Sequence, residues 1–262
     1  MQRVVNSKQR LVNSVAYLSG KLFALTDKGR VRDTNEDYAV TSINAYGNIL
    51  LIVCDGMGGA NKGEYASSTI AKTIVKEFNE NEKEFTNPNQ IKKWINKVVS
   101  KANKVVFEKA QKEKEYLGMG TTLSLVILAK DILVSAQVGD SRIYLLKDNK
   151  LSQLSVDQTY VQYLSHNNKI TQEETVTHKD RHKLTNALGT KKIVNVDIND
   201  YKYNHEKILI CSDGLYNNVS EKIIESILVG NDSLDKKCQQ LIAFGNAGGG
   251  SDNMAVVIWE SN

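Results

Sequence analysis

The stretch Ile49-Leu50-Leu51-Ile52-Val53-Cys54-Asp55-Gly56-Met57-Gly58-Gly59 decides how this chain folds. It opens with an unbroken apolar run of strand length, which is typical of a strand covered on both faces. An aspartate follows at once, and the glycines after it let the backbone turn sharply. We therefore expect a buried strand over residues 49–54, with Asp55 held at one end of a sheet core.

Three further acidic turns border apolar runs in the same way. These turns are Arg32–Asp37, Cys211–Gly214 and Ser251–Asn253. Carboxylates without histidine or thiolate partners form sites for hard divalent cations. The candidate metal ligands are the carboxylates of Glu36, Asp55, Asp213 and Asp252. If they converge, they can hold two cations about 4 Å apart, and a water between such ions becomes a nucleophile near neutral pH.

Each of these features also has a plainer interpretation. An Asp-Gly pair at a strand end is often only a turn, and Asp252 can cap a turn or helix. Asp140, within Gly139-Asp140-Ser141-Arg142, is typical of a tight hairpin. Arg32 suits bidentate binding of a phosphoryl group, although a lone arginine is commonly a surface residue. Their combined order between matching strands is what favours a two-metal site.

Composition narrows the class of protein. The 262 residues, 41% hydrophobic and 24% charged, suit one large globular domain. A net charge of +4 with dispersed Lys and Arg argues against nucleic-acid binding. No apolar run approaches the roughly 20 residues of a membrane span, and residues 1–20 lack a signal-peptide core. We expect a cytoplasmic protein with no membrane partner. Its three cysteines argue against a disulfide framework, and Cys54 and Cys211 are expected to be core residues rather than reactive thiols.

Two long amphipathic helices are expected in the first half of the chain. Apolar residues four apart predict a helix over residues 63–79, and Asn87-Pro88 marks the start of another. Each has one apolar face, which needs a sheet to cover it. Residues 157–185 are polar and helix-prone, with a capping box at 171–174, and are interpreted as a flap. Shorter helices are expected over residues 220–228 and 233–244.

Strand patterns occupy most of the rest. Residues 121–129, 132–138 and 142–147 are β-rich runs separated by short turns, which predicts an antiparallel meander. Residues 1–20 show no clear period and are interpreted as a tail or arm, whereas residues 21–262 are expected to form one domain. Other strands are expected over residues 21–27, 37–43, 49–54, 193–198, 207–211 and 254–259.

A series of ordered motifs spans the chain from about Leu22 to Glu260. The motifs are Thr26–Arg32 with Asn35–Asp37, Asp55–Gly59, Gly118–Thr122, Val138–Arg142, Leu184–Gly189, Ser212–Leu215 and Gly250–Asn253. Together they resemble the metal-dependent protein phosphatase 2C family in its compact bacterial form. The resemblance implies an α+β fold, a four-layer α/β/β/α sandwich with two central antiparallel β-sheets flanked by helices. It also implies a serine/threonine phosphoprotein phosphatase that uses metal-activated water at a binuclear Mn²⁺ or Mg²⁺ centre and opposes a bacterial Ser/Thr protein kinase.

The same resemblance assigns roles to the acidic residues. Asp55 would bridge two metal ions, and Gly56 would offer its backbone carbonyl to the second. Asp213 and Asp252 would complete the first ion, and Glu36 would bind the second through water.

The remaining roles concern substrate. Arg32 would bind the substrate phosphate, and Asp140 together with Asp213 would hold a weaker third ion. The flap at 157–185 would contact the substrate protein. Met57 stands where animal members have a histidine proposed as general acid, so another group must protonate the leaving oxygen. Asp157-Gln158-Thr159 stands where bacterial members often read Asp-His-Ser.

Two other functions remain open from the sequence. One is a non-catalytic regulator that keeps the fold without metals, and the complete acidic set argues against it. The other is a two-metal phosphodiesterase acting on nucleic acid, which the lack of basic patches and aromatic runs disfavours. The expected partners are phosphoserine and phosphothreonine proteins and a cognate kinase, and a monomer is expected.

Overall fold

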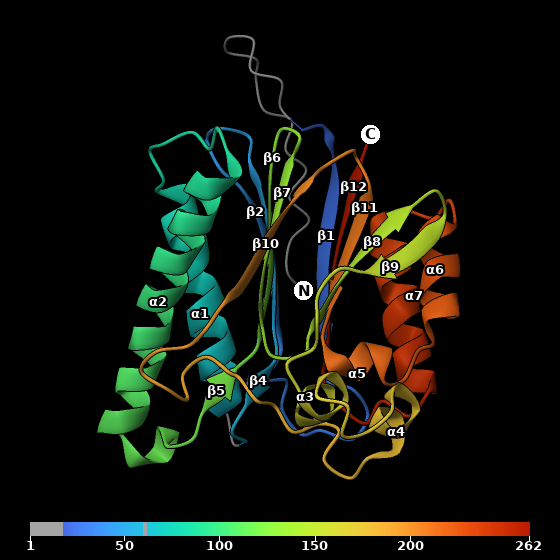
Figure 1. Ribbon diagram of the computed structural model, residues 1–262. Coiled ribbons are helices and arrows are strands. Elements are labelled where there is room, and N and C mark those ends of the chain that lie inside the picture. The colour runs from blue at the N-terminus through green and yellow to red at the C-terminus, as the bar shows by residue number, and fades with distance from the viewer. Residues whose placement is uncertain (1–17, 60–61) are drawn as a thin grey trace.

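The computed structural model describes residues 18–59 and 62–262, which form a four-layer α/β/β/α sandwich (Figure 1). Two five-stranded antiparallel sheets lie face to face in the centre, and helices cover the outer face of each. The fold class expected from the motifs is therefore confirmed. The predicted arm over residues 1–20 falls almost wholly outside the described residues. No helix within them combines the length and apolar character needed to cross a membrane.

The first sheet joins both ends of the chain. Its strands are, in spatial order, β1 (Gly20–Asp27), β12 (Met254–Ser261), β11 (Lys207–Cys211), β8 (Arg142–Lys147) and β9 (Lys150–Gln153). The predicted meander is wrong at its third strand, because β8 pairs with β11 and β9 and not with its predecessor in sequence. Side chains alternate between the two faces of a strand in the same way in either sheet. The sequence pattern of residues 142–147 therefore could not reveal that this strand belongs to the other sheet.

The second sheet contains the apolar run of residues 49–54. Its strands are, in spatial order, β10 (Asp197–Lys202), β7 (Ile132–Val138), β6 (Leu123–Ala129), β3 (Ile49–Cys54) and β2 (Tyr38–Ile43). Two short strands, β4 (Gly56–Met57) and β5 (Gly120–Thr121), pair with each other as a separate sheet. Along β3, Leu50 and Ile52 face the outer helices whereas Leu51 and Val53 face the other sheet. Both faces of β3 are covered, which explains its unbroken apolar run.

The predicted strand over residues 193–198 is displaced in the structure. β10 begins only at Asp197, and Val194 and Val196 pack beside the helix-side core as part of a loop. The side chain of Asn103 explains the loop, because it donates hydrogen bonds to the carbonyls of Lys191 and Lys192 at 3.0 and 3.2 Å. An apolar alternation that packs on a helix cannot be told from a strand by period alone.

Helices form the two outer layers. The second sheet is covered by α1 (Lys62–Asn79) and α2 (Pro88–Lys112), which leads into the 3₁₀ turn η1 (Lys114–Tyr116); the first sheet is covered by α6 (Glu221–Val229) and α7 (Leu234–Ala247). The flap contains α3 (Tyr160–His166) and α4 (Gln172–Thr177), and the predicted capping box at Thr171 is present. A one-turn helix that was not predicted, α5 (Asp213–Tyr216), lies beside the flap in Figure 1.

Candidate metal centre

The acidic residues singled out in the sequence lie at one end of the stacked sheets. They stand where strands end or begin at that edge: Asp55 after β3, Asp213 after β11, Asp252 before β12, Asp140 between β7 and β8, and Glu36 and Asp37 before β2. In antiparallel pairs the end of one strand lies beside the start of its partner. The Asp55 carboxyl is close enough to feel the charges of Asp37, Asp213, Asp140 and Asp252. The structure thus brings the separate acidic turns together.

The backbone around Asp55 is fully occupied by hydrogen bonds. Its N–H donates to Thr122 Oγ1 at 2.9 Å, and its carbonyl accepts from Thr121 Oγ1 at 2.8 Å. The following residue, Gly56, lies so close to α1 that an added Cβ would be 2.3 Å from the Gly63 carbonyl oxygen. Glycine is therefore required for this approach. These contacts fix the backbone and hold the Asp55 side chain among the carboxyls of Asp37 and Asp213, with which it shares hydrogen bonds.

Glu36 is oriented by the first turn of α1 and by the turn before β12. Its Oε1 accepts from the Gly63 N–H at 3.1 Å, close to the helix N-terminus, where the helix dipole favours a carboxylate. Its carbonyl accepts from Ser67 Oγ at 2.6 Å, and its N–H donates to Asn253 Oδ1 at 2.9 Å. Asn253 therefore ties the loop of Glu36 to the turn that carries Asp252.

Asp37 belongs to the same cluster, although the sequence analysis gave it no role. Ser212 Oγ donates to Asp37 Oδ2 at 2.6 Å. Burial, reinforced by the nearby charges of Asp213 and Asp252 and partly offset by that hydrogen bond, raises the pKa of Asp37 to about 8. The available signal was its place beside Glu36 in an acidic turn at the start of a strand.

The carboxylates of the cluster outnumber the positively charged side chains that could neutralise them. Burial, followed by repulsion from neighbouring aspartates, raises the pKa of Asp55 well above its usual range, and raises the pKa of Asp213. Burial and the charge of Asp213 likewise raise the pKa of Asp140 to about 8. A divalent cation removes such repulsion, and a donor set made only of oxygens fits Mn²⁺ or Mg²⁺.

The carboxylates are gathered but not yet arranged as a coordination shell. In the ranges 18–59 and 62–262, no three His, Cys, Asp or Glu side chains already surround one ion position. Asp252 explains part of this, because its Oδ2 lies 2.8 Å from Arg32 Nη2 and its Oδ1 accepts from the Asn253 N–H. The predicted phosphate ligand and a predicted metal ligand are thus paired with each other. An ion pair this exposed, with Arg32 52% accessible, is weak enough to exchange.

The flap contributes a histidine at the edge of the cluster. His182 Nδ1 lies 3.8 Å from Asp213 Oδ2, and the His182 side chain is half exposed. His182 lies within the flap, near its end. Its proximity to a predicted ligand was not foreseen, because residues 182 and 213 are brought together only by the fold.

A sandwich of this architecture with buried carboxylates at one edge defines a class, the metal-dependent phosphatases. The family model of protein phosphatase 2C matches residues 28–245, and the chain belongs to that family and is a protein phosphatase. It is 37% identical over 238 residues to a serine/threonine phosphatase, stp, from Listeria welshimeri, which covers 90% of this chain and 94% of that relative.

Solved structures agree with this assignment. The serine/threonine phosphatase of S. agalactiae superposes with a TM-score of 0.88 at 30% identity, covering 93% of this chain and 100% of that one. The catalytic domain of the phosphatase PstP, solved in complex with two manganese ions, superposes with a TM-score of 0.80 at 29% identity, covering 92% and 97%. Dependence on a divalent metal is therefore a property of the family to which this chain belongs.

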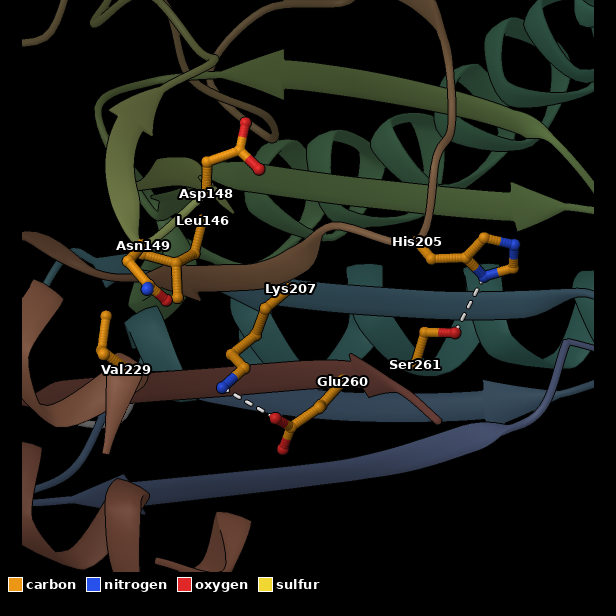
Figure 2. Close-up of a pocket in the computed structure, with 8 residues that line it drawn as sticks. All are labelled: Leu146, Asp148, Asn149, His205, Lys207, Val229, Glu260 and Ser261. Atoms are coloured by element: carbon orange, nitrogen blue, oxygen red, sulfur yellow. Dashed lines mark hydrogen bonds and ion pairs between the residues drawn. The ribbon is translucent and has the colours of Figure 1, made fainter. Parts of the chain in front are cut away.

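A cavity of about 240 Å³ lies away from the acidic cluster, at the opposite end of β11 and β12. Figure 2 shows Lys207 directed toward Glu260 and His205 directed toward Ser261 across its wall. The first pair is separated by 2.8 Å and the second by 2.9 Å. These polar groups satisfy one another, so this end of the sheet is interpreted as structural.

Proposed function

We propose that this chain hydrolyses phosphoserine and phosphothreonine esters of proteins at the acidic cluster around Asp55. The observation that carries the proposal is the crowding of that partly buried carboxyl with four other aspartates, an arrangement that divalent cations stabilise. Two Mn²⁺ or Mg²⁺ ions fit the all-oxygen donor set. When bound, such ions neutralise phosphate charge and activate the attacking water.

Each residue of the cluster has a distinct task in this proposal. The carboxylates of Asp55, Asp213 and Asp252 would hold the ions, with Asp55 shared between them. The Gly56 carbonyl would serve as a further oxygen ligand, and Glu36 would act through a bound water. The hydrogen bonds of Thr121 and Thr122 to the Asp55 backbone keep the bridging side chain at the edge of the sheet.

Arg32 exchanges one anion for another during binding. In the structure its guanidinium is paired with Asp252. A substrate phosphate offers the same guanidinium two oxygens, which matches its planar pair of donors. We infer that Asp252 turns to a metal ion as Arg32 turns to the phosphate, so that metal and substrate binding support each other.

Asp140 and Asp213 would hold a third, weaker ion in this proposal. The departing oxygen of serine or threonine needs a proton, and Met57 has none to donate. Asp140 lies next to the start of the flap, because the carbonyl of the preceding Gly139 accepts from the Gln158 N–H at 2.9 Å and Arg142 pairs with Asp157. This part of the cluster is therefore suited to act on the leaving group.

The biological setting is proposed by the same reasoning. We expect the substrates to be proteins phosphorylated by a cognate serine/threonine kinase. We also expect the enzyme to act in the cytoplasm as a monomer, with either Mn²⁺ or Mg²⁺ as its resident metal.

The test compares hydrolysis of p-nitrophenyl phosphate and of a phosphothreonine peptide before and after exhaustive chelation, with metal content measured by elemental analysis. Activity should vanish with the metal and return with Mn²⁺ or Mg²⁺. Full turnover by metal-free protein would refute the metal mechanism. A regulator would bind the peptide without turnover, and a phosphodiesterase would prefer bis(p-nitrophenyl) phosphate.

A further inference from the structure

The flap is attached to the body of the protein through a narrow neck. Its first and last residues lie side by side: Tyr160 N–H donates to the Lys183 carbonyl at 2.8 Å, and Thr185 N–H donates to the Gln158 carbonyl at 2.9 Å. Thr185 Oγ1 donates to the same carbonyl at 2.9 Å. Motion of the flap therefore has to pass through the few residues around Gln158.

Gln158 binds this neck to the residue that precedes Asp140. Its backbone N–H donates to the Gly139 carbonyl at 2.9 Å, and its side-chain Oε1 accepts from the Gly139 N–H at 3.0 Å. The same Oε1 accepts from Asn186 Nδ2 at 2.9 Å. One amide oxygen thus joins the start of the flap, the end of the flap and the Gly139–Asp140 turn.

The turn on which Gln158 acts has little freedom of its own. Gly139 adopts φ +92°, and an added Cβ there would lie 2.6 Å from a methyl group of Thr122. Thr122 is the residue that accepts the Asp55 N–H. A displacement of the Gly139 backbone would therefore move Asp140 and press on the residue that holds Asp55.

We propose that the Gln158 side chain is a positioning residue that fixes Asp140 relative to the flap. The proposal rests on the function proposed above, because it assigns Asp140 to the leaving-group side of the reaction. Gln158 contacts no substrate in this role. It couples the segment that meets the substrate protein to the carboxylate that acts on its oxygen.

The first measurement is independent of catalysis: amide hydrogen exchange at Gly139 in Gln158→Met. Methionine keeps the length of the side chain but cannot accept the Gly139 N–H, so exchange there should rise at least about tenfold. Gln162→Met is the matched control, since within the described residues the Gln162 side chain makes no hydrogen bond. Unchanged exchange at Gly139 in Gln158→Met would overturn the proposed positioning role of Gln158, whatever the enzyme's activity. If that variant does not fold, Asn186→Leu is measured in its place, with the same expected direction.

The second measurement places the effect on Asp140. Gln158→Met should reduce kcat for a phosphothreonine peptide about tenfold while p-nitrophenyl phosphate hydrolysis falls less than about threefold. In the double variant with Asp140→Ala, the peptide rate should be no lower than in Asp140→Ala alone. Additive losses would mean that Gln158 acts on folding or on peptide binding, and would overturn the proposal. A wild-type protein without phosphatase activity would refute the proposed function and leave the exchange result standing.

Discussion

The two ends of strands β11 and β12 both bury charged side chains, but with opposite outcomes. At the far end, Lys207 Nζ lies 2.8 Å from Glu260 and shares the Leu228 carbonyl with the buried Lys237. Figure 2 shows the first of these pairs within the wall of the cavity. At the metal end, aspartates surround Asp55, and removal from water together with their charges raises its pKa.

The metal end gives up stability for function, whereas the far end does not. Paired charges at the far end can remain buried without another partner. Like charges at the metal end repel one another in a setting of low polarity, and they persist because a cation binds them. Removing a charge should therefore have opposite effects on metal-free stability at the two ends of the sheet.

The largest effect is expected for Asp55→Asn. This change removes the bridging carboxylate while keeping the shape, so kcat for both substrates should fall at least about a hundredfold. The metal-free variant should nevertheless melt at a higher temperature than the metal-free wild type at pH 8, because a repelling buried charge is gone. Glu260→Gln is the counterpart at the far end, and it should lower the melting temperature.

The sign of the pH dependence follows from the raised pKa of Asp55. A carboxyl whose folded pKa lies above its unfolded value keeps its proton more tightly when folded, so stability falls as pH rises through that interval. The melting temperature of metal-free wild type should drop relative to Asp55→Asn between pH 5 and pH 8. Parallel melting curves for the two proteins would show that Asp55 bears no such strain.

Arg32→Ala should have the next largest effect. It removes a bidentate phosphate contact, so kcat/KM should fall by about one to two orders of magnitude. Since Asp252 loses its partner, the concentration of Mn²⁺ needed for half-maximal activity should stay the same or decrease. Arg30→Ala, two residues earlier and also exposed, is the control and should leave both quantities unchanged. A weaker metal affinity in Arg32→Ala would contradict the exchange of partners.

Asp140→Ala separates two leaving groups. A nitrophenolate departs without a proton, whereas a serine or threonine alkoxide does not. Peptide hydrolysis should therefore fall about tenfold more than p-nitrophenyl phosphate hydrolysis. If Asp140 only shapes the turn, both rates should decline together with the melting temperature, which the same preparations can report.

The sequence predicted those parts of the molecule that depend on local pattern. Strand β3, its terminal Asp55 and the start of α2 at Asn87 lie where the pattern predicted them. The assignment of β8 to the first sheet was missed, because its partner strand Lys207–Cys211 is distant in sequence. The alternation of side chains along β8 would look the same in either sheet.

The site shows the same division. Family motifs predicted which carboxylates gather, but contacts made by side chains across the fold could not be read from spacing. The pairing of Arg32 with Asp252 spans 220 positions, and Asp37 meets Ser212 across 175. His182 lies 3.8 Å from Asp213, and its position depends on how both ends of the flap are attached to the rest of the fold. Such contacts follow from how loops pack once the strands are placed.

The smallest effect is expected at the far end, for Lys237→Met. Lys237 is 1% exposed, and burial, together with the neighbouring Lys207, lowers its pKa to about 8. The unfolded chain therefore binds more protons than the folded one between about pH 8 and the ordinary lysine value of about 10.4. Stability contributed by this position rises with pH across that window, since the folded protein no longer buries an ammonium.

Methionine keeps an unbranched side chain without the charge, so the melting temperature of wild type should rise relative to Lys237→Met from pH 7.5 to 9.5, and kcat should differ by less than about twofold. Parallel melting curves would mean that the charged form is fully stabilised by Leu228 and Glu260. A large loss of kcat would mean that the two ends of the sheet are not independent.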